Sequence, residues 1–203
     1  MVQQTLFGRG PLGLRPVLDG ARRISLDHGA WVVHRPGWVR GQDVLFDLLR
    51  RSIRWQSGSR RMYERTVSVP RLTAHLPDHG PGPAILHEMS AELSRVFERR
   101  LTRIGMAWYR DGRDSVAPHG DRVGLLKDDC IVAIVSLGGP RRFLLRPAGG
   151  GRSRSWDLGW GDLFVMGGTC QRTFVHSIPK VAAAEPRISV MFRPALPEKS
   201  RMS

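Results

Sequence analysis

The second half of the chain constrains the fold most, because the pattern of residues changes after Gly105. From there on, short apolar or alternating runs are separated by glycine and proline. Runs of this length and spacing are typical of antiparallel strands, which pack as a sandwich or a barrel. The predicted strands are Met106–Arg110, Ile131–Leu137, Arg142–Arg146, Asp162–Met166, Arg172–His176 and Arg187–Arg193.

Two earlier stretches have helical periodicity instead. Apolar residues recur at helical spacing between Gln42 and Ile53, and one apolar stripe runs along the segment from Pro83 to Arg100. Pro83 suits the first turn of a helix. Because helices come first and strands follow, we expect a mainly β fold of the α+β class, with the helices packed outside the β-structure.

The length of 203 residues fits one domain. Residues 1–36 are rich in glycine, proline and arginine with little periodicity, so we expect an N-terminal arm or loops there. A single domain then covers residues 37–203, with the helices in 37–104 and the β core in 105–195. By default we expect a monomer.

The formal net charge of +14 is large for a chain of this length. It would attract polyanions such as nucleic acid through counterion release, although membrane headgroups or acidic proteins would be attracted too. Only three of the 32 basic residues are lysines, so the charge could instead reflect a GC-rich genome that favours arginine codons. Charge alone therefore leaves the partner open.

No segment of the sequence is typical of a membrane protein or of a secreted one. The longest apolar run, around residues 131–137, is far shorter than the about 20 residues of a spanning helix. The N-terminus lacks the pattern of a secretory signal, so we expect a cytoplasmic protein. The two cysteines, Cys130 and Cys170, are too few for a disulfide framework, and we expect buried thiols.

The sharpest local feature is the triplet His119-Gly120-Asp121. In a strand, residues two apart point to the same face, so this imidazole and this carboxylate could bind one ion. His176 in a later predicted strand would complete a set of two histidines and one carboxylate, which holds ferrous iron and leaves coordination sites open. A structural histidine bonded to a nearby aspartate is the alternative for the triplet alone.

The last predicted strand sorts its residues by alternation. Arg187, Ser189, Met191 and Arg193 fall on one face, and the other face is apolar. Two arginines that point into a barrel would be costly to bury unpaired, so they would require an anionic partner. A dicarboxylate co-substrate would supply one, because a guanidinium can grip a carboxylate with two hydrogen bonds. An edge strand with its arginines in solvent is the alternative.

Several separated motifs together resemble the AlkB family of iron- and 2-oxoglutarate-dependent dioxygenases. The run from Tyr109 through Asp111-Gly112-Arg113-Asp114 to His119-Gly120-Asp121 is similar to a family block in which a tyrosine and a D-G-x-D loop precede the iron ligands. Later motifs agree in order and spacing, and the resemblance covers roughly residues 60–195. These later motifs are Gly161-Asp162-Leu163, Gly167-Gly168, Arg172, His176 and Arg187–Arg193.

The resemblance implies a double-stranded β-helix, or jelly roll, with His119, Asp121 and His176 as ligands of Fe(II). It also implies 2-oxoglutarate as co-substrate, with Arg187 on its distal carboxylate, and O2 as oxidant. The family oxidises N-linked alkyl groups on nucleic-acid bases and releases aldehyde, succinate and CO2. The residues that would line the co-substrate pocket are Tyr109, Arg187, Ser189 and Arg193.

Two positions depart from the family pattern. Ala107 stands where the family often has an asparagine, so one hydrogen bond to the co-substrate is missing or replaced. Val123 stands where the family often has an acidic residue near the flipped base, which puts the base preference in doubt.

Upstream of the β core, arginines are interleaved with aromatic residues, a mixture suited to phosphate contacts and base stacking. In the resemblance this region corresponds to the family's nucleotide-recognition lid. A solvated arginine face with its aromatic residues in the core is the alternative. The residues expected to contact nucleic acid are Trp55, Arg60, Arg61, Met62, Tyr63 and Arg71.

The leading hypothesis is therefore a base dealkylase that acts on alkylated nucleic acid, with DNA expected before RNA, and with no protein partner implied. A second hypothesis keeps the same chemistry on a small molecule or a protein side chain. A third is a basic nucleic-acid-binding module without turnover, against which the intact ligand and arginine positions argue.

Overall fold

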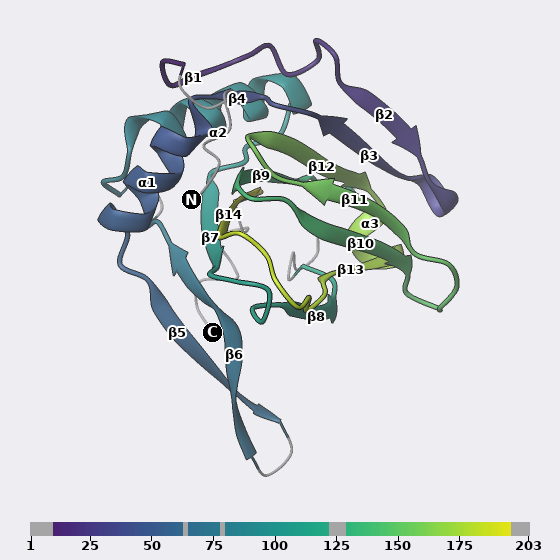
Figure 1. Ribbon diagram of the computed structural model, residues 1–203. Helices are drawn as coiled ribbons and strands as arrows, with labels where there is room; N and C mark the ends of the chain where they lie inside the picture. The colour runs from purple at the N-terminus through teal and green to yellow at the C-terminus, as the bar shows by residue number, and fades with distance from the viewer. Residues whose placement is uncertain (1–9, 63–64, 78–79, 122–128, 196–203) are drawn as a thin grey trace.

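The computed structural model describes residues 10–62, 65–77, 80–121 and 129–195, and of residues 59–62 and 65–69 it describes the backbone alone. Its centre is a large antiparallel sheet of eight strands in the order β2-β3-β12-β9-β14-β7-β6-β5 (Figure 1). These strands are Arg22–Ser25 (β2), Ala30–Arg35 (β3), Asp162–Gly168 (β12), Val132–Gly138 (β9), Arg187–Arg193 (β14), Arg103–Tyr109 (β7), Arg65–His75 (β6) and Gln56–Met62 (β5).

A smaller antiparallel sheet has four strands in the order β11-β10-β13-β8. From β7 onward the chain alternates between the two sheets, and only the β10–β11 hairpin stays within one of them. This alternation is the jelly-roll arrangement, so the predicted fold is confirmed. The strands are Arg154–Leu158 (β11), Arg141–Pro147 (β10), Phe174–Ile178 (β13) and Val116–His119 (β8).

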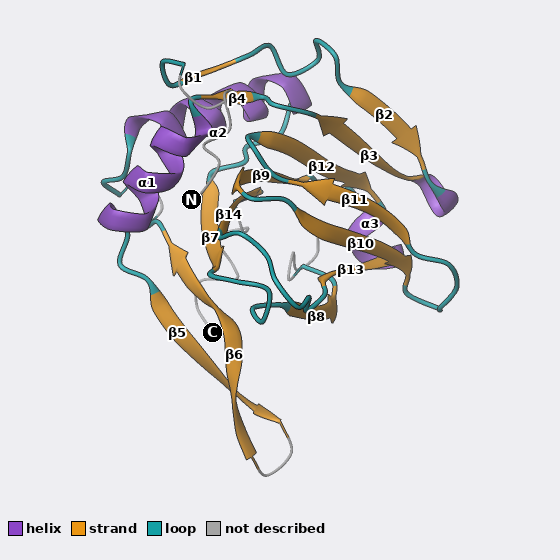
Figure 2. Ribbon diagram, viewed as in Figure 1, coloured by secondary structure: helices purple, strands orange, loops and turns teal. Residues whose placement is uncertain are grey.

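Two helices, α1 and α2, lie together beside one end of the large sheet (Figure 2). The predicted helices agree with them within a few residues, and Pro83 precedes α2 instead of opening its first turn. A short helix, α3, leads directly into β13. The remaining bounds are Gln42–Ser52 (α1), Ala84–Phe97 (α2), Cys170–Thr173 (α3), the 3-10 turn Asp27–Gly29, and the paired strands Gly13–Leu14 (β1) and Val39–Arg40 (β4).

Each face of the large sheet packs on its own apolar cluster. One cluster joins the sheet to the helices and includes Leu45 of α1, Leu86 of α2 and Val190 of β14, all fully buried. The second cluster fills the space between the sheets, where Phe143 of β10 packs on Phe164 of β12 with ring centroids 5.0 Å apart. The functional residues discussed below come from both sheets, and Tyr109 of β7 is a member of this second cluster.

The β5–β6 hairpin extends from the edge of the large sheet and projects beyond the rest of the molecule (Figure 1). Its base is attached to the core, because β6 pairs with β7 from Leu72 to His75. The residues predicted to contact nucleic acid, between Trp55 and Arg71, therefore fall mostly on an arm of two long strands.

The structure corrects three expectations. Residues 1–36 were expected as an arm or loops, but β2 and β3 extend the large sheet, because Ala30 to Arg35 has buried residues on both of its faces. Arg172 and Thr173 belong to α3 and not to a strand. Strand β11 was not predicted, since Arg154–Leu158 has only one fully buried residue.

Cys130 and Cys170 are buried free thiols, as expected. Among the described residues, no helix has both the length and the apolar character needed to cross a membrane.

Candidate metal and co-substrate site

The structure brings His119, Asp121 and His176 together, with one ligand atom of each within 4.8 Å of the others. His119 is the last residue of β8 and lies directly opposite His176 of β13, and the two imidazole centroids are 4.4 Å apart. Asp121 lies two residues beyond the end of β8. The prediction that His119 and Asp121 lie close together is therefore correct. The reason given for it is wrong, because the two residues do not lie within one strand.

Asp121 is held in a way that leaves one carboxylate oxygen free. Arg193 of β14 donates to Oδ1 at 2.7 Å, while Oδ2 is buried without a hydrogen-bond partner. Burial alone would raise the pKa of this carboxyl, but Arg193, through its charge and its hydrogen bond, and the neighbouring imidazoles outweigh burial and hold the pKa below its ordinary value. An ionised oxygen therefore faces the two imidazoles.

Both imidazoles present a lone pair. The Nδ1 of His119 lies 2.9 Å from the carbonyl oxygen of Ala117, which can only accept, so Nδ1 carries the proton and Nε2 is free. Burial lowers the pKa of His176 to about 4, although Asp121 opposes that shift. His176 is neutral at physiological pH, and its ring stacks on Phe143 at an interplanar angle of 17°.

Two imidazoles and one carboxylate that gather from one side fit a first-row metal ion and leave its other side open. The unpartnered Oδ2 of Asp121 supports this fit, because a buried carboxylate oxygen without a donor is costly unless a cation pairs with it. Neither cysteine belongs to this group of residues, and burial raises the pKa of both thiols to about 12.

A second incomplete site surrounds Arg187, at the start of β14. Only 1% of this side chain is exposed, and its Nη2 donates to Ser136 Oγ at 2.7 Å. Nε and Nη1 are buried without partners. Burial lowers the pKa of the guanidinium to about 10, which still leaves it charged at neutral pH. A buried cation with two free donors requires an anion, so a carboxylate fits here.

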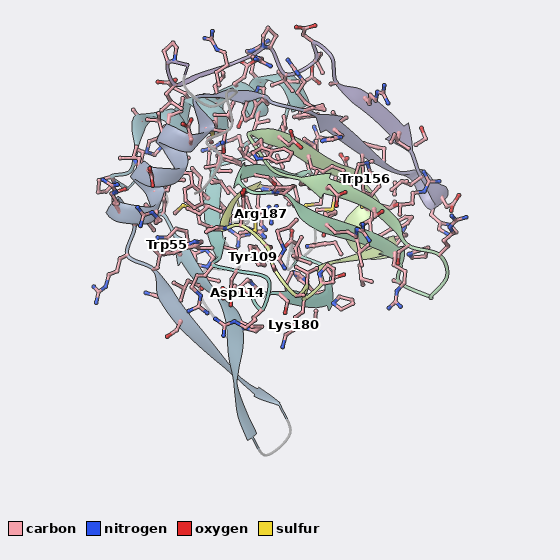
Figure 3. The ribbon with its side chains drawn as sticks, in the orientation of Figure 1. Trp55, Tyr109, Asp114, Trp156, Lys180 and Arg187 are labelled. Atoms are coloured by element: carbon pink, nitrogen blue, oxygen red, sulfur yellow. The ribbon has the colours of Figure 1, made fainter. Side chains whose placement is uncertain are left out.

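Tyr109 lies beside Arg187 in the middle of the molecule (Figure 3). The two residues pair across β7 and β14, and the guanidinium carbon is 5.4 Å from the ring centroid. Burial raises the pKa of Tyr109, and the charge of Arg187 opposes the rise, so the phenol stays protonated. Its hydroxyl can therefore donate to an anion that binds Arg187.

The other predicted pocket residues lie in the next rows of the same sheet face. Ser189 is buried opposite Ala107 on one side and Ser136 on the other. This row of small side chains separates Arg187 from Arg193, the residue that binds Asp121. Strand β14 thus carries one cation at its first residue and one, beside Asp121, at its last residue, and the alternation predicted for residues 187–193 is confirmed.

Prediction from sequence missed two residues that shape the site. Arg141 of β10 is buried and donates to the carbonyl oxygens of Asp111, Asp114 and Pro179, which joins the loop after β7 to the segment after β13. Gln171 of α3 accepts a hydrogen bond from the backbone N–H of Asp121 at 3.0 Å. Neither residue type has a spacing that marks it in the sequence.

The residues predicted to contact nucleic acid have different placements. Trp55 is partly buried against the hydrophobic core and lies beside Trp108, with ring centroids 5.5 Å apart, and its contact with nucleic acid stays a prediction. Arg71 is half-buried, donates to the Ser115 carbonyl at 3.2 Å, and its charge acts on His176. Arg60, Arg61 and Met62 are described as backbone of β5 only, and Tyr63, like Val123, lies outside the described residues.

Comparisons with known proteins agree with this geometry. A model described as the 2OG-Fe(II) oxygenase superfamily matches residues 50–198. The DNA oxidative demethylase ALKBH2 of Arabidopsis thaliana is 26% identical over 85% of this chain and 68% of its own. The alpha-ketoglutarate-dependent dioxygenase alkB homolog 3 of Bos taurus is 28% identical over 80% of this chain and 65% of its own. The chain thus spans about two thirds of these relatives.

Two solved structures share the fold. The structure of OsALKBH1 superposes with a TM-score of 0.62 at 14% identity, over 86% of this chain and 100% of that chain. An oxidoreductase of the 2OG-Fe(II) oxygenase family from Burkholderia pseudomallei gives a TM-score of 0.55 at 14% identity, over 87% and 85% of the two chains. At these identities the likeness concerns the fold alone.

Proposed function

This chain belongs to the AlkB family within the 2OG-Fe(II) oxygenase superfamily, and from that premise we propose that it removes N-linked alkyl groups from bases of DNA, or of RNA, by oxidation. It is a dioxygenase that uses Fe(II), 2-oxoglutarate and O2. The observation that carries the proposal is the triad with a free carboxylate oxygen on the smaller sheet, together with a buried arginine with two free donors on the large sheet.

Fe(II) and 2-oxoglutarate, when bound, supply activated oxygen for attack on a C–H bond. His119, Asp121 and His176 would hold the metal from one side. Arg187 would grip the distal carboxylate through its two free donors, with Tyr109 beside it. Because the sheet face around these groups is buried, bulk water would be excluded from the co-substrate.

The atoms of the proposed reaction balance with one O2. One oxygen atom enters succinate as 2-oxoglutarate loses CO2, and the other becomes a hydroxyl group on the N-alkyl carbon. The carbon–nitrogen bond then breaks with its electron pair going to the base nitrogen, the hydroxyl group loses its proton, and the alkyl carbon leaves as an aldehyde. The chain's own contribution is the placement of both reactants, with the histidine ligands on the smaller sheet and Arg187 on the large sheet.

A nucleic-acid substrate is supported by charge and by the position of the β5–β6 hairpin. The chain has a net charge of +14, and this hairpin contains Arg60, Arg61 and Arg65 in its sequence. Its base is attached to the segment that leads into β8, because Ser115 N–H donates to the Pro70 carbonyl at 2.7 Å. A base would have to leave its stack to reach a buried metal, and a basic hairpin beside the site would hold the flanking backbone.

The decisive experiment measures aldehyde release from oligonucleotides that contain 1-methyladenine or 3-methylcytosine. Purified protein is supplied with ferrous iron, ascorbate and 2-oxoglutarate, and DNA and RNA versions are compared. We expect release that requires iron and 2-oxoglutarate and that disappears in Asp121→Ala. Asp157→Ala, which removes an exposed carboxylate on β11, is the matched control and should keep full activity.

Succinate formation without any change in the methylated bases would contradict the nucleic-acid assignment. It would favour the second hypothesis, in which the same chemistry acts on a small molecule or a protein side chain. Equal aldehyde release by Asp121→Ala would contradict the metal assignment itself.

A further inference from the structure

We propose that Gln171 is a positioning residue that sets the place of the metal ligand Asp121, and thereby the affinity for the metal. The side-chain Oε1 of Gln171 accepts the backbone N–H of Asp121 at 3.0 Å. Gln171 is only 6% exposed, so this bond is shielded from water. The inference rests on the metal site of the proposed function and adds a residue to it.

Asp121 needs such support because the sheet does not hold it. Strand β8 ends at His119, and the pairing of β8 with β13 already shifts register between His176 and Ile178. The backbone N–H of Asp121 therefore lacks a ladder partner, and the side chain of Gln171 takes that place. Without this acceptor, the backbone N–H of Asp121 would lose its hydrogen bond unless the segment moved.

Gln171 is itself firmly placed. It lies in α3, where the N–H groups of Arg172 and Thr173 donate to the carbonyl of Thr169. The hydroxyl of Thr169 in turn donates to the carbonyl of His28, which fixes the start of the helix. Since α3 continues directly into β13, the element that binds Asp121 is the same one that carries His176.

Gly120 provides a second contact between the two ligand-bearing segments. A Cβ atom on Gly120 would lie 3.1 Å from the carbonyl oxygen of Gln171, so the residue between the two ligands lies close against α3. The distance between Asp121 and His176 is therefore set by packing and by one hydrogen bond, and not by strand pairing.

Arg193 and Gln171 divide the task of holding Asp121. Arg193 holds the carboxylate oxygen Oδ1 and supplies charge, whereas Gln171 is neutral and holds the main chain. Oδ2 remains free for the metal. Removal of the Gln171 acceptor would thus change the position of the carboxylate without a change of local charge. Outer partners of this kind typically contribute about 10–100-fold to metal affinity.

The test is a Co(II) titration of the metal-free protein, without 2-oxoglutarate, followed by the visible absorption of the bound ion. Gln171→Met keeps the length of the side chain and removes the acceptor, and we expect binding about 10-fold weaker with an altered spectrum. Gln171→Glu keeps an acceptor for the N–H of Asp121, so its binding should be no weaker than that of the wild type.

Ser94→Ala is the matched control, because Ser94 of α2 likewise accepts a backbone N–H, that of Leu101 at 3.0 Å, far from the ligands in sequence and on another element. We expect it to lower thermal stability and leave Co(II) affinity and spectrum unchanged. Wild-type affinity and spectrum in Gln171→Met would overturn the proposal, as would an equal loss in Gln171→Glu. Failure of the wild-type protein to bind Co(II) would instead overturn the metal site of the proposed function.

Discussion

Arg187 is a charged side chain that the fold buries almost completely, with one neutral partner and two free donors. Burial of this kind is costly, and here it lowers the pKa of the guanidinium to about 10. The protein therefore carries an unfavourable residue at the centre of its main sheet. Such a cost is expected at a binding site, where the ligand supplies the missing partner.

We predict that Arg187→Met makes the protein without 2-oxoglutarate more stable, by about 1–3 kcal/mol, because an unpaired buried charge is replaced by an apolar side chain of similar length. The same variant should no longer be stabilised by added 2-oxoglutarate. Urea unfolding with and without the co-substrate measures both effects. Arg142→Met, at an exposed position of β10, should change neither, and a less stable Arg187→Met would contradict the prediction.

At the scale of elements, the large sheet depends on close contacts that local sequence does not reveal. Gly167 of β12 lies under the ring of Trp31 on β3, and a Cβ atom there would come within 2.0 Å of that ring. Trp31 in turn stacks on Phe97 at the end of α2, with centroids 6.2 Å apart. Gly167 thus leaves room on β12 for the ring of Trp31, and Trp31 in turn connects β3 to the end of α2.

We predict that Gly167→Ala destabilises the protein by about 1–3 kcal/mol, because the added methyl group forces Trp31 out of its place. Gly149→Ala is the control, since nothing lies within 4 Å of a Cβ atom at that hairpin position, and its effect should stay within about 0.5 kcal/mol. Chemical denaturation of the three proteins compares them directly. If Gly167→Ala and Gly149→Ala were equally stable, the close packing of Gly167 against Trp31 would not be needed for the stability of the protein.

At the scale of the whole molecule, the net charge is +14, and nearly all of the basic residues are arginines. A charge of this size favours binding to the phosphate backbone of any nucleic acid, irrespective of sequence. The chemistry of the site would then select the alkylated base, while the arginines supply affinity. Binding and turnover are therefore expected to respond differently to salt.

We predict that binding of a single-stranded oligonucleotide weakens steeply with salt. With four phosphate contacts, the affinity would fall about 50-fold between about 50 and 200 mM salt. Fluorescence anisotropy with a labelled oligonucleotide measures this slope, and succinate formation without substrate nucleic acid is the control that should change little. Affinity independent of salt would mean that the charge has no role in recognition.

Much of the site was readable from the sequence, because residue type and local periodicity record which chemistry a segment can supply. The alternation from Arg187 to Arg193 predicted the strand and the residues on each face, and the AlkB resemblance predicted the family. Both helices and most strands of the core were predicted for the same reason. An apolar period of two or of 3.6 residues is imposed locally by the side that must be buried.

Only the tertiary structure decided how these pieces meet. It placed Asp121 beyond the end of β8, packed the ring of Trp55 beside that of Trp108, and assigned Gln171 and Arg141 to the site. Each of these outcomes depends on hydrogen bonds or packing between segments that are far apart in the chain. The sequence alone determined which groups could bind iron and a dicarboxylate. The pairing of strands and loops determined the positions of these groups. The physical reason is that a backbone N–H or a buried ring contacts its partner only in the folded chain.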